Sequence, residues 1–211
     1  MLGLLVLSIA MMERGNYVKS CAVFTLLLGF KHIFLFMAPG FLAFLLHNVI
    51  LLPEGVNFAA TLKLLLTGSA LVLLTFFPFL STCHQGHMPQ VLSRLFPFSR
   101  GLTHAYWAPN VWAIYNSIDG LLSYCRLHSV LHGKFTTEYM QGLVQVNSHS
   151  VLPNITPGVS LFLVLLTITF CLRANRRRSL CDQACLSCFC FFLFGWQVHE
   201  KTILMILVPL L

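Results

Sequence analysis

Long apolar runs with almost no charge are the feature that most limits what this chain can fold into. The clearest run extends from Phe58 to Leu80, and its one charged residue, Lys63, lies near its start. A helix needs about 20 apolar residues to cross a bilayer, so this run is long enough, and the Lys63 side chain can extend to the lipid headgroups. We therefore expect a membrane protein.

The composition supports a membrane protein and argues against other classes. Hydrophobic residues make up 57% of the 211 residues and charged residues only 9%, whereas soluble domains carry about 25% charged residues. The formal net charge is +7, and clustered basic residues in so apolar a chain are typical of anchoring at lipid headgroups. Because a long basic face is missing, we expect membrane lipid as a partner and no nucleic acid.

Further apolar segments predict an all-α polytopic membrane protein. The run from Cys21 to Leu52 is too long for one crossing and contains Pro39-Gly40, which predicts either two helices meeting there or one kinked helix. Either arrangement turns Lys31 and His32 toward a polar cavity or interface rather than lipid. The other apolar segments are 111–124, which is ambiguous because it contains Asn116 and Asp119, and 159–172, 185–196 and 202–211.

The short apolar segments at the start and end of the chain predict a helix bundle that is incomplete at both ends. Met1 to Met12 is half the length of a membrane crossing, and Thr202 to Leu211 is apolar and stops without an interfacial anchor. The competing interpretation of the first segment is a signal peptide, although it lacks a preceding basic residue and a small-residue cleavage site. We expect an interior portion of a longer multi-span domain, with residues 1–211 as part of that one domain.

Two polar segments indicate the topology. Residues 82–110 contain prolines, histidines and arginines and are expected to form an interfacial or lumenal loop, or a short amphipathic helix. Residues 173–183 include four arginines between Arg173 and Arg178 and are expected to form a basic cytosolic loop. That orientation places residues 199–201 and the sequon Asn154-Ile155-Thr156 on the lumenal side, although Pro157 disfavours glycosylation of the sequon.

The cysteines and histidines do not predict a metal centre. Four of the eight cysteines lie between Cys181 and Cys190, in or beside an apolar run, without the paired spacing typical of a zinc site. We interpret them as small hydrophobic residues that pack within a helix, with zinc as the weaker alternative. The histidines share no ligand spacing, so we expect no metal.

Three stretches, in order along the chain, resemble one family. Residues 89–112 read PQVLSRLFPFSRGLTHAYWAPNVW, residues 194–204 read FGWQVHEKTIL, and residues 30–34 read FKHIF shortly before Ala38-Pro39. They resemble the endoplasmic-reticulum glucosyltransferases that extend the lipid-linked oligosaccharide for N-glycosylation. Residues 104–110 are similar to the members that add the second glucose, because the corresponding stretch of the members that add the first is more acidic.

The resemblance implies a hexosyltransferase of the endoplasmic-reticulum membrane with many membrane spans. It implies a GT-C type helix bundle, no cofactor, and transfer of glucose from dolichyl-phosphate glucose to Glc1Man9GlcNAc2-diphosphodolichol with formation of an alpha-1,3 bond. Members of the family are more than twice as long as this chain, and their catalytic carboxylate lies in a first lumenal loop that the resemblance places before Met1. The alternative is a non-catalytic membrane binding or assembly protein derived from that family.

The transfer reaction itself directs attention to particular side chains. It needs a carboxylate as base on the acceptor hydroxyl, and cations or hydrogen-bond donors that hold the leaving phosphate. The predicted substrate-binding residues are the polar side chains of the matched stretches: Lys31, His32, Arg94, Arg100, His104, His199 and Lys201. Glu200 is the best-placed acid present, and we expect it to act either as the base or as an ion-pair partner of Lys201.

Other functions remain open for several of these residues. His199 is expected either to contact the donor phosphate or to orient a helix end. Arg94 and Arg100 fit phosphate binding as well as anchoring at the headgroups. Tyr106, Trp107 and Trp112 are suited to stacking on sugar rings or to an aromatic belt at the membrane interface.

Overall fold

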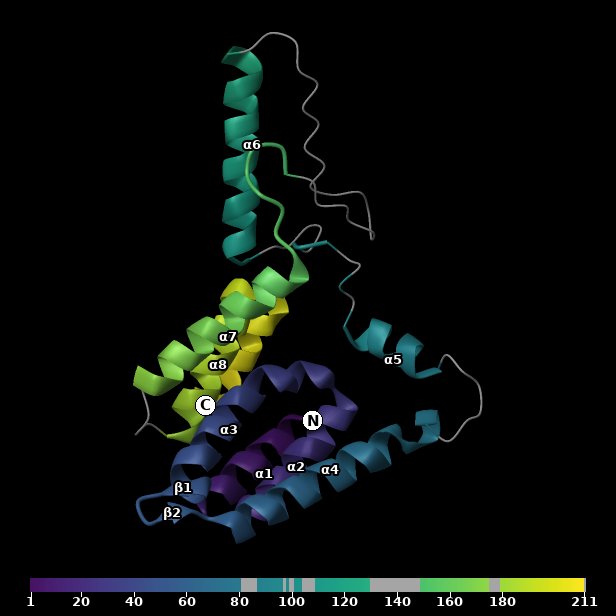
Figure 1. The fold of residues 1–211 in the computed structure, drawn as a ribbon, viewed down its shortest axis with the longest axis vertical. Coiled ribbons are helices and arrows are strands. Elements are labelled where there is room, and N and C mark those ends of the chain that lie inside the picture. The colour runs from purple at the N-terminus through teal and green to yellow at the C-terminus, as the bar shows by residue number, and fades with distance from the viewer. Residues whose placement is uncertain are drawn as a thin grey trace. The chain divides into compact units, whose positions relative to one another are not determined.

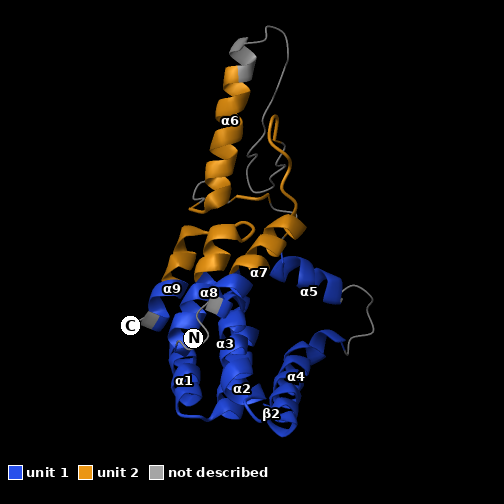
Figure 2. Ribbon diagram, turned by 60° about the vertical axis from the view of Figure 1, so that its left-hand side comes forward, with its two compact units in different colours: residues 1–96, 168–188, 205–211 blue, residues 97–167, 189–204 orange. Residues whose placement is uncertain are grey.

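The computed structural model describes residues 1–80, 87–96, 98, 101–103, 109–129, 149–174 and 179–210. These residues are mainly helical, which confirms the all-α prediction (Figure 1). The chain divides into two compact units (Figure 2): unit 1 contains residues 1–96, 168–188 and 205–211, and unit 2 contains residues 97–167 and 189–204.

Unit 1 begins with a pair of neighbouring helices, α1 (Leu2–Glu13) and α2 (Tyr17–Phe30). Two fully buried serines join them: the Ser20 hydroxyl donates to the Ser8 carbonyl oxygen at 2.7 Å, and the two hydroxyl oxygens lie 3.2 Å apart. Small hydroxyl side chains let helices approach closely and give each buried polar group a partner. The turn between the helices contains Gly15 at φ 76°, a left-handed conformation that glycine adopts without strain.

The apolar run from Cys21 to Leu52 is broken at Lys31, and its helical part changes type directly before Pro39. Lys31 is extended (φ −155°, ψ 107°), and a continuous helical stretch follows: the 3-10 helix η1 (His32–Met37), α3 (Ala38–Leu45) and the π-helical turn η2 (Leu46–Ile50). Pro39 lies in the first turn of α3, where a missing N–H costs nothing. The change from the 3-10 helix η1 to the α-helix α3 thus occurs directly before Pro39, next to the predicted meeting point of two helices, and Lys31 adds a break that was not predicted.

A small antiparallel hairpin, β1 (Leu51–Leu52) and β2 (Gly55–Val56), leads into α4 (Phe58–Leu80). The bounds of α4 are those predicted from the sequence. Within the described residues, two helical stretches are long and apolar enough to cross a membrane by length and composition, namely His32–Ile50 and Phe58–Leu80. α5 (His87–Leu95) follows, inside the segment expected to form a loop or short amphipathic helix.

The rest of the chain contributes to both units. α6 (Val111–Ser129) belongs to unit 2, whereas α7 (Pro157–Ala174) and α8 (Leu180–Phe194) each divide between the units. The 3-10 helix η3 (Glu200–Ile203), α9 (Leu204–Leu207) and the 3-10 turn η4 (Val208–Leu210) complete the chain. Within the expected basic loop 173–183, α7 extends to Ala174 and α8 begins at Leu180.

The core of unit 1 forms where α1, α2, α3 and the first turns of α8 meet. Phe24 and Phe41 stack with ring centroids 4.1 Å apart, and both are buried. Gly40 lies directly against α8, since a Cβ there would meet the carbonyl oxygen of Gln183 at 2.5 Å and the Cα of Ala184 at 2.7 Å. The glycine thus permits a backbone-to-backbone approach of α3 and α8.

Candidate active site

Two of the stretches that carry the family resemblance are hydrogen-bonded to each other within unit 2. The backbone N–H of Gln197 donates to the carbonyl oxygen of Leu102 at 2.9 Å, and the Leu102 side chain is fully buried. Residues 95 positions apart in the chain are thereby held together. The fold brings residues 101–103 and 194–204 into one locality, as expected if both contribute to one site.

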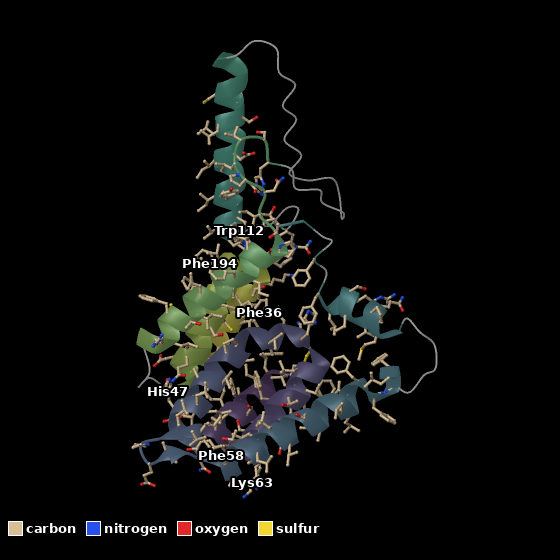
Figure 3. All side chains as sticks on the ribbon, viewed as in Figure 1. Phe36, His47, Phe58, Lys63, Trp112 and Phe194 are labelled. Atoms are coloured by element: carbon tan, nitrogen blue, oxygen red, sulfur yellow. The ribbon has the colours of Figure 1, made fainter. Side chains whose placement is uncertain are left out.

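Side chains of α6, of α7 and of Asn110, which directly precedes α6, fix the end of α8. Asn110 Nδ2 donates to the carbonyl oxygen of Gly195 at 3.1 Å, and Trp112 Nε1 donates to that of Phe194 at 3.0 Å. The Ser160 hydroxyl donates to the same Phe194 oxygen at 2.6 Å. The last carbonyl groups of a helix have no partner inside it, so these donors determine how the chain leaves α8. Figure 3 shows Trp112 close to Phe194.

The chain then turns tightly before η3. Gln197 has φ 50°, a left-handed conformation uncommon for a residue other than glycine. Gly195 leaves no room for a side chain, since a Cβ would meet the Phe191 carbonyl oxygen and lie 2.8 Å from Val198 Cγ2. Backbone strain of this kind persists where the surroundings enforce it, often at functional sites. Here it sets the direction in which residues 199–201 begin η3.

His199 is the N-cap of η3, and one of its ring nitrogens, Nδ1, lies close to two polar groups. Nδ1 accepts a hydrogen bond from the Lys201 backbone N–H at 3.2 Å, and it lies 2.9 Å from Glu200 Oε2. Nδ1 can either accept from Lys201 when it is unprotonated or donate to Glu200 when it is protonated, but not both. In the first state the neutral ring carries its proton on Nε2, which is then a donor suited to a phosphate oxygen.

Glu200 therefore pairs with His199 rather than with Lys201. Its Oε2 atom is buried, and His199 Nδ1 is its one polar neighbour among the described residues. The pair is partly exposed, with 37% of the His199 side chain and 39% of the Glu200 side chain accessible. Lys201 is exposed beside the pair.

A second acid of unit 2, Asp119 on α6, has a different environment. It is completely buried, and its carboxylate accepts three backbone N–H bonds, from Ser150 at 3.0 Å, Val151 at 2.9 Å and Leu152 at 2.7 Å. A buried carboxylate is tolerated only when it is well hydrogen-bonded. The Asp119 carboxylate thus holds residues 150–152 against α6. Because its oxygens already accept these hydrogen bonds, Asp119 is a poor catalytic base.

A polar network continues from Asp119 along α6. Asn116 Nδ2 donates to Thr103 Oγ1 at 3.2 Å, and Asn116 Oδ1 lies 2.9 Å from Nε2 of His149. Asn154 Oδ1 accepts the His149 backbone N–H at 2.8 Å. The network connects α6 both to Thr103 in the motif segment and to the residues that precede α7.

Tyr115, one turn before Asp119, completes this connection. Its hydroxyl donates to the carbonyl oxygen of Pro153 at 2.8 Å. Burial, and secondly the negative charge of Asp119, raise the pKa of the Tyr115 phenol above its ordinary value. The phenol consequently remains protonated and a donor at neutral pH.

Three other predicted site residues lie in unit 1. Lys31, His32 and Arg94 are exposed, and the His32 ring contacts Phe96, just after α5, with ring centroids 6.4 Å apart. Lys31 itself lies at the break between α2 and η1. Arg100 and His104 lie outside the described residues, as do Tyr106 and Trp107.

The described part of the site distinguishes between some of the alternatives. Trp112 is only 3% exposed and packs edge-on against Tyr115 and Phe194, which favours a packing role over stacking on a sugar. On α8, Cys185, Cys188 and Cys190 are buried, which fits their interpretation as packing residues. No group of three potential metal ligands occurs within the described residues.

The sequence did not indicate that Asn110 and Ser160 fix the end of α8. Their partners are backbone carbonyls 85 and 34 positions away. A usable signal was present for Asn110, since it lies within a quoted motif and directly before a helix, where Asn is a preferred cap. For Asp119 the signal was a lone acid inside an otherwise apolar segment.

Comparison with known proteins identifies relatives over the whole chain. The profile described as the ALG6, ALG8 glycosyltransferase family matches residues 1–211. The chain is 45% identical over 217 residues to a "Probable dolichyl pyrophosphate Glc1Man9GlcNAc2 alpha-1,3-glucosyltransferase" of Drosophila melanogaster, covering 99% of this chain and 41% of the relative.

Two further relatives carry the name "Dolichyl pyrophosphate Glc1Man9GlcNAc2 alpha-1,3-glucosyltransferase". The one from Dictyostelium discoideum is 34% identical, with 99% of this chain and 39% of the relative covered. The one from Caenorhabditis elegans is 39% identical, with 97% of this chain and 28% of the relative covered. The chain thus spans less than half the length of these curated relatives.

Proposed function

The chain belongs to the ALG6, ALG8 glycosyltransferase family, and we propose that it forms the part of an alpha-1,3-glucosyltransferase that binds the phosphate of the glucose donor. The proposed donor is dolichyl-phosphate glucose, and the proposed acceptor is the Glc1Man9GlcNAc2-dolichyl pyrophosphate named for the relatives. The proposed location is the endoplasmic-reticulum membrane, with a multi-span GT-C bundle. The family membership and the two helical stretches of membrane-spanning length support that location.

The observation that carries the proposal is the way unit 2 presents His199. Hydrogen bonds from residues of α6 and α7, and the bond between Gln197 and Leu102, fix the turn that ends at His199. Because His199 Nδ1 accepts the backbone N–H of Lys201, the neutral imidazole ring carries its proton on Nε2. The exposed ammonium group of Lys201 adds a positive charge nearby. A donor and a cation held by a rigid backbone suit a leaving phosphate.

The reaction assigns these residues a defined part. The acceptor hydroxyl oxygen forms a bond to the anomeric carbon, and the bond from that carbon to the phosphate oxygen breaks with the electron pair on the oxygen. The His199 Nε2–H and the Lys201 ammonium stabilise the charge on the departing dolichyl phosphate. The hydroxyl proton passes to a base, for which neither Asp119 nor Glu200 is well suited, because each already has hydrogen-bonded or ion-paired neighbours.

Glu200 is proposed to position His199 rather than to remove the proton. Its Oε2 atom lies 2.9 Å from His199 Nδ1 and so restricts the orientation of the imidazole ring at the start of η3. Arg94, Arg100, His104, Lys31 and His32 stay predicted contributors to substrate binding. The predictions for Arg100 and His104 come from the sequence alone.

The test uses the Drosophila relative with its matching segment replaced by this chain. The purified chimera is assayed for transfer of labelled glucose from dolichyl-phosphate glucose to Glc1Man9GlcNAc2-diphosphodolichol. We expect His199→Ala to lower kcat/KM by about a hundredfold, as for loss of one donor to a developing anion. His47→Ala, a histidine of unit 1 labelled in Figure 3, is the matched control and is expected to retain activity.

His199→Asn separates the two functions considered for this residue. Asparagine is a good N-cap, so it replaces Nδ1 as the acceptor for the Lys201 N–H but does not reach as far as imidazole Nε2. If His199 contacts the phosphate, His199→Asn loses activity like His199→Ala. Full activity of His199→Asn would show that His199 only orients the start of η3, and the proposed phosphate contact would be wrong.

A further inference from the structure

Unit 1 contains a cavity of about 490 Å³ that shares no residue with the candidate site of unit 2. It lies where α2 and α4 begin, and we call it the α2–α4 cavity. Its lining includes the turn and first residues of α2 (15–19), Val49, Asn57, Lys63 and Leu64. Two lysines and two helix N-termini therefore border one cavity that is open to the surface.

The first turn of α2 offers unused hydrogen-bond donors to this cavity. The helix has 14 residues, and Asn16 at its N-cap makes no side-chain capping bond. Among the described residues, the N–H groups of Tyr17, Val18 and Lys19 have no acceptor, whereas the next N–H, of Ser20, bonds to the Asn16 carbonyl oxygen. Uncapped N–H groups at a helix start carry partial positive charge and bind anions.

The start of α4 adds to the same positive region. Asn57 precedes α4, and its Oδ1 accepts the Ala60 N–H at 3.1 Å, while its own N–H bonds to the Ile50 carbonyl oxygen at 2.9 Å. These bonds fix the N-terminal end of a 23-residue helix at the cavity. The positive ends of two helix dipoles therefore converge on it.

The two lysines supply full charges that the protein itself does not neutralise. Lys19 and Lys63 are both exposed, and neither lies within 4.0 Å of a carboxylate oxygen among the described residues. Of the acids at this end, Glu13 accepts the N–H of Leu180 at 3.2 Å, and Glu54 is exposed on the hairpin turn and does not line the cavity. Figure 3 labels Lys63 and Phe58 at this end of α4.

We propose that the α2–α4 cavity binds the phosphate group of an anionic phospholipid headgroup. Phosphate oxygens match the donors present, which are three backbone N–H groups and two ammonium groups. The site is independent of the donor phosphate site proposed in unit 2, because the two share no residue. A soluble phosphate offers the same chemistry, so the experiment must distinguish the two sources.

The orientation expected from the sequence supports a lipid source. The hydrogen bond from Leu180 to Glu13 places the α1–α2 turn beside the residues that follow the basic segment 173–178. A basic segment next to membrane helices is retained on the cytosolic side, and the cytosolic leaflet is rich in anionic lipids. The cavity would then face phosphatidylinositol and phosphatidylserine headgroups.

The test measures binding of dioleoyl-phosphatidylinositol to the full 211-residue chain in neutral detergent by native mass spectrometry, with dioleoyl-phosphatidylcholine as the comparison lipid. We expect Lys19→Gln and Lys63→Gln each to weaken phosphatidylinositol binding about fivefold, as for one basic residue at an anionic surface. Arg14→Gln removes the same charge at the same end but outside the lining of the cavity, and we expect a change of less than twofold.

A second pair of variants tests the backbone donors without removing a lysine. Val18 is 37% exposed in the first turn of α2, where an acidic side chain stabilises a helix. Val18→Asp puts a carboxylate beside the uncapped N–H groups and should abolish phosphatidylinositol binding while the thermal unfolding midpoint is kept or raised. Val18→Asn is the uncharged control and should still bind the lipid.

Inorganic phosphate at about 10 mM is then added as a competitor, a concentration at which a millimolar site would be occupied. Retained phosphatidylinositol binding supports a site specific for the lipid, and displacement of the lipid supports the phosphate chemistry with a soluble anion as a second source. Equal binding of phosphatidylinositol to the wild-type chain and to the folded Lys19→Gln/Lys63→Gln double variant would overturn the proposal, as would equal binding of phosphatidylcholine and phosphatidylinositol to the wild-type chain.

Discussion

The carboxylate of Asp119 offers the sharpest test of how unit 2 holds its shape. Asp119→Asn keeps the size of the side chain but replaces Oδ2, the acceptor of the Ser150 N–H, by an amide donor. The lost hydrogen bond has a charged acceptor and is worth about 2 kcal/mol. The N–H groups of Val151 and Leu152 keep an acceptor, but it becomes neutral, which weakens each of these two bonds by about 0.5–1 kcal/mol. The expected local loss is about 3 kcal/mol.

Hydrogen–deuterium exchange of residues 149–154 in the full chain measures this loss directly. If exchange requires local opening, about 3 kcal/mol corresponds to exchange of residues 150–152 faster by about a hundredfold. Asp182→Asn is the matched control, because Asp182 is half-buried in the first turn of α8 and belongs to unit 1, whereas residues 150–152 belong to unit 2. An Asp119→Asn chain whose residues 150–152 exchange within threefold of the wild-type rate would refute the assigned role of this carboxylate.

Three further substitutions test the packing of the backbone. Gly40→Ala should lower the free energy of unfolding by about 1–3 kcal/mol, because the new Cβ meets backbone atoms of Gln183 that cannot move aside; an unchanged thermal midpoint would contradict this contact. Gln197→Gly should keep or increase stability, whereas Gln197→Val should cost about 1–2 kcal/mol at a positive φ; equal stability of the two variants would count against the strained turn. Ser20→Ala should cost about 1 kcal/mol by removing the bond from its hydroxyl to the Ser8 carbonyl oxygen, while the Ser8 hydroxyl keeps the carbonyl oxygen of residue 20 as acceptor, and the Ser8→Ala/Ser20→Ala double variant should cost less than the sum of the single losses; additive losses in a double-mutant cycle would speak against this pairing.

The apolar segments could be predicted from the sequence because length and hydrophobicity alone decide them. Phe58–Leu80 forms a helix with the predicted bounds, since nothing inside it interrupts the pattern except Pro78 near its end. In the preceding run, Pro39 lies in the first turn of a new α-helix, as a proline near a helix boundary predicts, whereas the break at Lys31 was missed because no proline or glycine marks it. The extended conformation of Lys31 is determined by the surrounding packing.

The candidate site was only partly accessible to sequence reasoning. The stretches around Arg94 and His199 were recognised as motifs, and residues 101–103 and 194–204 do meet in unit 2. The contacts that fix them could not be derived, because Asn110 and Ser160 act on backbone carbonyls, which have no sequence signature. The sequence left Lys201 as the expected partner of Glu200, whereas the structure pairs Glu200 with His199, because side-chain directions at the start of a short 3-10 helix are not readable from residue spacing alone.

The most direct test of the central proposal is the lipid-linked oligosaccharide profile of cells that lack the Glc1Man9GlcNAc2 glucosyltransferase and express the chimera of this chain with the Drosophila relative. We expect the chimera to convert the accumulated Glc1Man9GlcNAc2 species to the species with two glucoses, and the His199→Ala chimera to leave the one-glucose species in place. Accumulation of the one-glucose species with the wild-type chimera present in the membrane would contradict the proposed function, and would favour a non-catalytic binding or assembly protein instead.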